Sequence, residues 1–400
     1  MPVKKVDYRF KILYALAIVM VVCTHTNGGG LDLMRHWFPY PSIQLAIFAF
    51  ASGYFYKKAH ESAPWHYIWR QFKRLIIPMY LYNFFYGVLS HILSLQGFSI
   101  GGYVTLDSLL LAPLYDGNQF FFNVGGWFVV PLFIIQFVNV FFRRLFAGLE
   151  SGSKQIPEWL FFGIALALGL LGNTLAIKGY NTGWWLLLVR PLYLLPFYAA
   201  GIFYRRVLEP REHISTFWLL AGLLAAKYLL AAWLGHMPDY TPMWCHDFTD
   251  GAAMPIIVGL LGIAFWLRIA RDLADSIGRS RAIGAIADST YSIMINQFLG
   301  FMLVKSFFAL VASMTSLFAD FDWAAYHSDI WYYYYPFGLE QSLLIYVVAG
   351  LVIPIFIQRG INFISRELAA LDARSSEPIG WRRRVYHGAR KEIAAENNVL

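Results

Sequence analysis

The sequence predicts an all-α membrane protein, a polytopic bundle of about ten transmembrane helices with both termini on the cytoplasmic side. Of its 400 residues, 58% are hydrophobic and only 14% are charged, whereas soluble domains average about 25% charged residues. Apolar runs such as residues 158–177 and 217–234 have the length that a bilayer core of about 30 Å requires. Because backbone amides have no water to bond in lipid, runs of this length must be helices.

Ten apolar segments define the predicted spans. They cover residues 10–27, 40–56, 75–95, 120–142, 157–177, 183–204, 214–234, 251–268, 284–313 and 338–358. The first follows a basic stretch but has no small-residue cleavage site after it, so we expect it to stay as an uncleaved helix. The ninth is longer than one crossing needs, so we expect it to tilt or to continue beyond the membrane.

The cationic residues set the predicted orientation. The termini and alternate connections carry 27 of the 32 Lys and Arg residues, whereas the opposite connections hold only Arg35 and Lys178. This split follows the positive-inside rule and predicts an even number of crossings with both termini in the cytoplasm. The cytoplasmic connections explain the net charge of +8 without a nucleic-acid partner.

Two regions are expected along the chain. Residues 1–360 form the transmembrane domain, and residues 361–400 form a basic cytoplasmic tail. Such a tail is expected to lie on anionic lipid headgroups. The two cysteines, Cys23 and Cys245, are far apart and are interpreted as small apolar residues rather than a disulfide or a metal site. The sequence does not decide whether the protein is a monomer or a homo-oligomer.

His25 is the first candidate for chemistry. It lies at the predicted outer end of the first span, in VVCTHTNGGG, and imidazole is the side chain best suited to proton transfer near neutral pH. The bland alternative is a polar residue at the membrane interface. Asn27 and the glycines that follow form a flexible backbone that a ligand could approach closely.

Arg70, Lys73 and Arg74 form a second candidate site. Their spacing of i, i+3 and i+4 places them on one face of a helix at the predicted cytoplasmic mouth of the bundle. Three cations on one face suit the binding of phosphates. The alternative is that they only enforce the positive-inside orientation.

Other polar residues lie within or beside the predicted spans. Arg190 and Lys305 fall in apolar runs, where charges usually face a cavity or a partner, whereas Lys227 is expected to extend to an interface. Asn296 and Gln297 suit either interhelical hydrogen bonds or ligand contact. Glu340 opens the tenth span, where it either pairs with a buried cation or is solvated. No motif for a phosphate loop, a metal site or a serine nucleophile is present.

The predicted outer connections are rich in aromatic and acidic residues. Examples are PDYTPMWCHDFTD at 238–250 and ADFDWAAYHSDIWYYYYPF at 319–337. Such loops suit the stacking of sugar rings and hydrogen bonds to hydroxyls, although interfacial belts of Trp and Tyr have the same composition.

Five segments together resemble the membrane acyltransferase-3 family, bacterial polytopic proteins that acylate carbohydrates and other envelope acceptors. They occur in the family order: ALAIVMVVCTH (15–25), LAIFAFASGYFYKK (45–58), RQFKRLIIPMYLY (70–82), GGWFVVPLF (125–133), which contains Trp127, and STYSIMINQFLG (289–300). Two positions depart from the family pattern. Tyr14 stands where the family commonly has Arg, and Gln297 stands where it commonly has His. Both departures indicate a divergent subgroup.

The resemblance implies a membrane O-acyltransferase that uses acyl-CoA, usually acetyl-CoA, as a donor substrate and binds no permanent cofactor. It implies that Arg70, Lys73 and Arg74 hold the donor phosphates, and that His25 serves as a general base or a transient acyl carrier. The acceptor would be a carbohydrate or glycan precursor under the outer loops. Two alternatives remain: a transporter of a glycan or small solute that uses Arg190 and Lys305, and a non-catalytic partner of a glycan-synthesis complex.

Overall fold

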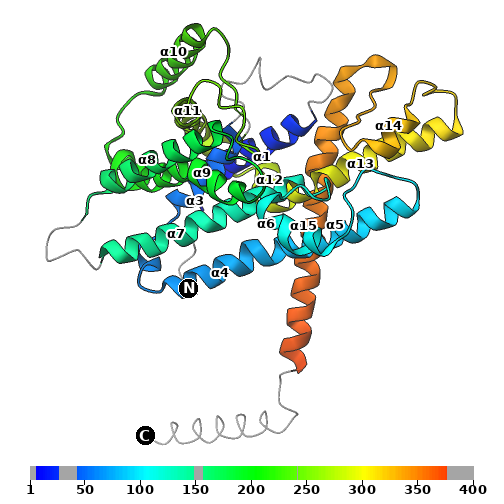
Figure 1. The fold of residues 1–400 in the computed structure, drawn as a ribbon, viewed down its shortest axis with the longest axis horizontal. Coiled ribbons are helices and arrows are strands. Elements are labelled where there is room, and N and C mark those ends of the chain that lie inside the picture. The colour runs from blue at the N-terminus through cyan, green and yellow to red at the C-terminus, as the bar shows by residue number, and fades with distance from the viewer. Residues whose placement is uncertain (1–5, 27–42, 148–155, 241, 376–400) are drawn as a thin grey trace, which may run out of the picture. The chain divides into compact units, whose positions relative to one another are not determined.

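The computed structural model describes residues 6–26, 43–147, 156–240 and 242–375 of the chain (Figure 1). Within these ranges the regular elements are helices, and none of these residues forms a strand. The chain divides into two compact units, Met1–Ile355 and Phe356–Leu400. All site residues discussed below belong to the first unit.

The long helices follow the predicted apolar segments. Their bounds are α1 Tyr8–His25, α3 Gln44–Tyr54, α5 Ile77–Leu95, α7 Val129–Ala147, α8 Glu158–Ile177, α9 Leu186–Phe203, α10 Thr216–Leu234, α11 Met254–Ile277, α13 Thr290–Met314 and α15 Leu343–Ser375. The short helix α4 Pro64–Gln71 precedes α5 outside the predicted span. Shorter helices, α6 Ala112–Tyr115, α12 Arg281–Asp288 and α14 Trp323–Ser328, lie in the connections. Asp7 defines the start of α1, because its carboxylate accepts a hydrogen bond from the backbone N–H of Arg9 at 3.1 Å.

Nine helical segments of the described residues are long and apolar enough to cross a membrane. The second predicted span, 40–56, is not among these nine segments. Its first residues lie outside the described ranges, and its helix, α3, has only 11 residues, a rise of about 16 Å that is short of the bilayer core. Because α3 is packed between α1, α9 and α11, neighbouring protein rather than lipid surrounds most of it.

The ninth predicted span, 284–313, is not one continuous helix. It breaks at Ser289, which separates α12 from α13, and α13 alone has the 25 residues that a crossing needs. The excess length therefore belongs to α12, a separate short helix before the candidate span Thr290–Met314. The physical reason is amphipathicity: α12 has exposed and half-buried residues along most of its length and packs on α1, as a helix outside the apolar core does.

Close packing of α3 on α9 explains the Ser-Gly-Tyr segment of the sequence. A Cβ atom on Gly53 would overlap the carbonyl oxygen of Tyr198, and one on Gly201 would overlap that of Phe50. Small residues of this kind allow helix backbones to approach closely inside membranes. Beside them, Ser52 accepts a hydrogen bond from Gln136 of α7 at 2.9 Å. Figure 1 shows α8, α9 and α11 beside one another, as their contacts require.

The third span is part of a longer helical segment, Pro64–Leu95, which contains a π-turn at Phe72–Ile76 between α4 and α5. Two further π-turns occur at Asp107–Leu111 and Tyr204–Leu208. Each π-turn holds one residue more than an α-turn, and such turns are frequent at functional sites.

The first unit has two chemically different ends. At the end that we call the charged end, α1 begins, α3 ends and α8 begins, and ion pairs such as Arg9–Glu209 at 2.5 Å and Arg268–Glu212 at 2.7 Å join the helices. At the opposite end, which we call the His25 end, α1 finishes and the connections 96–123 and 315–342 meet through a hydrogen bond from Ser99 N–H to the His327 carbonyl.

Candidate functional site

His25 is the last residue of α1, and its side chain is half-buried. Its Nδ1 atom lies 3.0 Å from Oε1 of Gln297 on α13. The Nε2 group of Gln297 donates to the Met294 carbonyl at 3.0 Å, which assigns the amide orientation. Since Oε1 can only accept, Nδ1 of a neutral His25 must carry the proton and Nε2 must present a lone pair. Nε2 has no hydrogen-bond partner within the described residues.

This tautomer is the one that a base or a nucleophile needs. An imidazole nitrogen with a free lone pair can accept a proton or attack a carbonyl carbon, and the hydrogen bond at the other nitrogen orients the ring. Gln297, which departs from the family pattern, therefore has a defined place as the partner of His25. The backbone of His25 is also held, because the Tyr333 hydroxyl donates to its carbonyl at 2.7 Å.

Aromatic rings surround the imidazole. The ring centroid of Phe298 lies 5.3 Å from that of His25, and the ring centroid of Trp331 lies 5.9 Å away. Trp331 keeps 39% of its surface exposed, although it also packs edge-on against Phe298 at 4.9 Å. An exposed indole beside an unpaired imidazole nitrogen is a surface on which a sugar ring can stack.

Lys305 holds the segment that carries this indole. The side chain is fully buried, and Nζ donates to the carbonyls of Asp329 and Ile330 at 3.2 and 3.0 Å. These two residues directly precede Trp331. Buried charges in membrane proteins commonly pair with backbone carbonyls, and here the pairing fixes the position of the connection over His25.

Arg190 and Trp127 also meet in the structure. The Arg190 guanidinium lies 4.9 Å from the centre of the Trp127 ring, close enough for a cation–π contact. Its Nε donates to the Met243 carbonyl at 2.7 Å, and Nη1 donates to the Asp116 carbonyl at 3.0 Å. Arg190 thus joins α9 to two connections of the His25 end, while its Nη2 is buried without a hydrogen-bond partner in the described residues.

The remaining candidates are dispersed. Asn296 accepts from the Tyr86 hydroxyl at 2.7 Å and donates to Ser292 at 2.9 Å, so it belongs to an interhelical network. Glu340 is exposed, and Asn27 lies outside the described residues. Lys227 is buried in α10, with its Nζ 5.7 Å from the Tyr228 ring.

Arg70, Lys73 and Arg74 lie together and are exposed. The sequence prediction assumed a regular α-helix, but Lys73 and Arg74 belong to the π-turn that follows Arg70. Among the described residues none of the three forms an ion pair; Arg70 lies over the Tyr67 ring at 5.9 Å. Of the three cations, Arg74 contributes to the electrostatic environment of the Tyr14 phenol on α1.

Sequence reasoning missed two parts of the site. Trp331 was only one of many aromatic residues in its segment, and nothing in the sequence distinguished it from its neighbours. The basic residues of a pocket at the charged end, described below, were interpreted only as topology signals. The sequence assigned each cation to its own connection, and it does not show that these separate connections lie together in the fold.

The described part of the chain can be compared with the requirements of a metal site and of a reactive thiol. Within the described ranges, no three His, Cys, Asp or Glu side chains lie together as metal ligands would. Cys23 and Cys245 are buried free thiols, and burial raises the pKa of Cys245 to about 12, so this thiol is a poor nucleophile at neutral pH.

Comparison with protein families gives one match of high coverage. The acyltransferase-3 family model, described as an acyltransferase domain, matches residues 7–357. Comparison with curated proteins and with solved structures gives no match. Because the family model spans most of the chain, the protein belongs to the acyltransferase-3 family and is a membrane acyltransferase.

Proposed function

We propose that this membrane acyltransferase moves an acyl group, acetyl in the simplest case, from cytoplasmic acyl-CoA to a hydroxyl of a carbohydrate or glycan precursor. In this proposal the chain lies in the cytoplasmic (inner) membrane and modifies envelope polysaccharide. The observation that carries the proposal is the unpaired Nε2 of His25, held by Gln297 beside the exposed ring of Trp331.

Two forms of the reaction use the same nitrogen. As a general base, Nε2 accepts the proton of the acceptor hydroxyl while the hydroxyl oxygen attacks the thioester carbon. The C–O bond forms, the C–S bond breaks, and the proton passes to the CoA sulfur. As an acyl carrier, Nε2 attacks the thioester first and CoA leaves as thiolate. The hydroxyl then displaces the imidazole, and its proton neutralises the thiolate.

The donor binds from the cytoplasm in both forms. Arg70, Lys73 and Arg74 are exposed and free of carboxylate partners among the described residues, which supports a role in holding phosphates. From there the pantetheine arm extends along α1 toward His25. The α1 helix has 18 residues, a rise of about 27 Å that a long, thin arm is suited to follow.

The test is a measurement of CoA release and of acylated product by purified protein with acetyl-CoA and a glycan acceptor. His25→Ala should abolish transfer while the protein remains folded and inserted; near-normal transfer would exclude His25. Rapid quenching with labelled donor and no acceptor separates the two forms, because only an acyl carrier leaves label on the wild-type protein.

The donor site has its own test. Replacement of both Arg70 and Arg74 by Ala should raise the KM for acyl-CoA roughly ten- to a hundredfold and leave the KM for acceptor unchanged. Arg70→Lys should restore binding only in part, because an ammonium lacks the planar fork of donors. Equal KM values for acyl-CoA in wild type and a properly inserted double variant would exclude the cluster as the donor site.

The structure gives less support to a transporter. Its proposed intramembrane charges, Arg190 and Lys305, direct donors to backbone carbonyls of adjoining connections. Most of their donors are thus engaged in fixing connections, although Nη2 of Arg190 has no hydrogen-bond partner among the described residues.

A further inference from the structure

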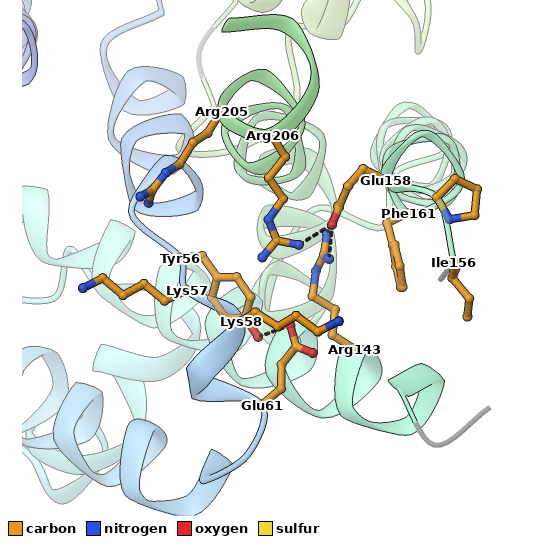
Figure 2. Close-up of a pocket in the computed structure, with 11 residues that line it drawn as sticks. Tyr56, Lys57, Lys58, Glu61, Arg143, Ile156, Glu158, Phe161, Arg205 and Arg206 are labelled. Atoms are coloured by element: carbon orange, nitrogen blue, oxygen red, sulfur yellow. Dashed lines mark hydrogen bonds and ion pairs between the residues drawn. The ribbon is translucent and has the colours of Figure 1, made fainter. Parts of the chain in front are cut away.

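A pocket of about 610 Å³ lies at the charged end, between the ends of α3, α7, α8 and α9 (Figure 2). Its volume falls in the range of small-molecule sites, about 300–1,000 Å³. Five cationic and two acidic side chains contribute to its lining: Lys57, Lys58, Arg143, Arg205, Arg206, Glu61 and Glu158. Tyr56 and Phe161 supply aromatic walls. The pocket thus combines excess positive charge with ring surfaces.

One carboxylate serves two guanidinium groups in this pocket. Arg143 donates to both oxygens of Glu158, at 3.1 and 2.8 Å, and Arg206 pairs with the same carboxylate. Figure 2 shows both arginines converging on Glu158. The Arg143 side chain is only 5% exposed, and its guanidinium also lies 4.3 Å from the Phe161 ring centre. A pair of cations that shares one anion leaves a net positive charge in a partly buried place.

The second carboxylate compensates this charge incompletely. Burial raises the pKa of Glu61, although the charges of Arg143, Arg206 and Lys58 act to lower it. Five cationic side chains and only two carboxylates line the pocket, so a positive excess among these residues persists even when Glu61 is ionised. Partly buried cations without sufficient counter-charge favour an anionic ligand.

Ring contacts, one edge-on and one stacked, connect the pocket to Arg70. The Tyr56 ring lies 5.4 Å from His60, His60 stacks on Tyr67 at 4.2 Å, and Arg70 lies over Tyr67. These contacts lead from the pocket through His60 and Tyr67 to Arg70.

We propose that this pocket binds the 3′-phosphorylated adenosine end of the acyl donor. The inference rests on the proposed function, because it concerns acyl-CoA. That donor carries phosphate at two places: a diphosphate next to the pantetheine arm and a separate phosphate on the ribose. If the arm runs along α1, the diphosphate falls at Arg70 and Arg74, and the nucleoside with its 3′-phosphate extends into the pocket. There the cations bind phosphate oxygens, and Tyr56 or Phe161 offers a face to the adenine ring.

The test compares two donors, acetyl-CoA and acetyl-3′-dephospho-CoA, with the full-length protein in nanodiscs of neutral lipid. The test variant replaces Lys57 and Lys58 by Ala; both side chains are exposed, so the fold should survive. The matched control is Arg281→Ala, an exposed cation of α12 outside the pocket. Wild type and control should have a KM for the dephospho donor roughly tenfold higher than for acetyl-CoA. The double variant should show the higher KM for both donors.

A binding measurement without turnover completes the design. Adenosine 3′,5′-bisphosphate should bind wild type more tightly than adenosine 5′-monophosphate, and the double variant should lose the difference. Equal KM values for the two donors in wild type, with normal CoA release, would overturn the pocket assignment and leave the proposed function intact. Absence of CoA release from acetyl-CoA would overturn the proposed function itself.

A lipid headgroup is the other phosphate source, and the experiment separates it. If added anionic lipid changes the KM values of wild type and the double variant differently while the two donors behave alike, the pocket binds lipid phosphate and the donor assignment is wrong.

Discussion

The two ends of the Met1–Ile355 unit stabilise buried cations by different means. At the charged end Arg143 and Arg206 share the carboxylate of Glu158. At the His25 end Arg190 and Lys305 have backbone carbonyls as hydrogen-bond acceptors. An ion pair with a carboxylate joins two side chains and so holds two helices together. A hydrogen bond to a backbone carbonyl instead holds the backbone, so a cation bound to carbonyls fixes the conformation of a connection. Ion pairs between helices thus stabilise the charged end, whereas hydrogen bonds to carbonyls position the connections at the His25 end.

The largest loss of stability is expected when the shared ion pair at the charged end is removed. Glu158→Gln removes the carboxylate that Arg143 and Arg206 share, and loss of one partner from a buried ion pair costs about 3 kcal/mol or more of unfolding free energy. Unfolding of the purified protein followed by heat or denaturant measures this loss. The exposed Glu340→Gln serves as the control, and equal stability of the two variants would show that the pair is not important for folding.

A smaller effect on stability, but a clear one on function, is expected at the His25 end. Lys305→Met keeps the length of the side chain and removes its charge, so relief of desolvation offsets part of the lost hydrogen bonds, which are worth about 1–3 kcal/mol. The connection that carries Trp331 should then be held less firmly. We expect a raised KM for acceptor with an unchanged KM for acyl-CoA; an equal rise in both constants would contradict a role in placing this connection.

Trp331 is expected to contribute directly to acceptor binding at the His25 end. Removal of an aromatic stacking partner typically weakens an interaction by about 0.5–1.5 kcal/mol. Trp331→Ala should therefore raise the KM for a glycan acceptor by roughly two- to tenfold, and Trp331→Phe should retain most of the affinity. If a non-carbohydrate acceptor shows the same loss in the Ala variant, the ring supports His25 rather than the sugar.

The side of the membrane on which each end lies can be tested without any change in activity. Single cysteines introduced at 238–250 or 319–335 should react with an impermeant reagent added from outside, and those at 57–70 or 370–400 should not. The two native cysteines are buried, which keeps the background low. Labelling of the C-terminal tail from outside would overturn the predicted orientation.

The sequence predicted the membrane helices well, because hydrophobic length determines which segments can lie in lipid. It failed where protein replaces lipid as the surroundings: α3 has only 11 residues because neighbouring helices cover it. It also began the ninth span at residue 284, so the span includes part of the amphipathic α12 that precedes α13.

The candidate site was predictable only in part. The sequence predicted His25 and Gln297 as candidates, but their contact depends on how α1 packs on α13. The pocket was not predictable, because its lining comes from residues 56–61, 143, 156–161 and 205–206, which no local spacing relates. Likewise, the carbonyl partners of Arg190 and Lys305 are invisible in a sequence, since every residue has one.

The π-turn at Phe72–Ile76 has a consequence for how this helix tolerates changes in length. One extra residue in a turn rotates all that follows by about 100° relative to a regular α-helix. The face of α5 that packs in the bundle is therefore out of phase with the face of α4, and the cations Lys73 and Arg74 lie at the change of phase. Deletion of a single residue there would give an unbroken helix of better hydrogen-bond geometry. It would also rotate Arg70 relative to α5. A regular α-helix in this segment is therefore incompatible with the present arrangement of its cations.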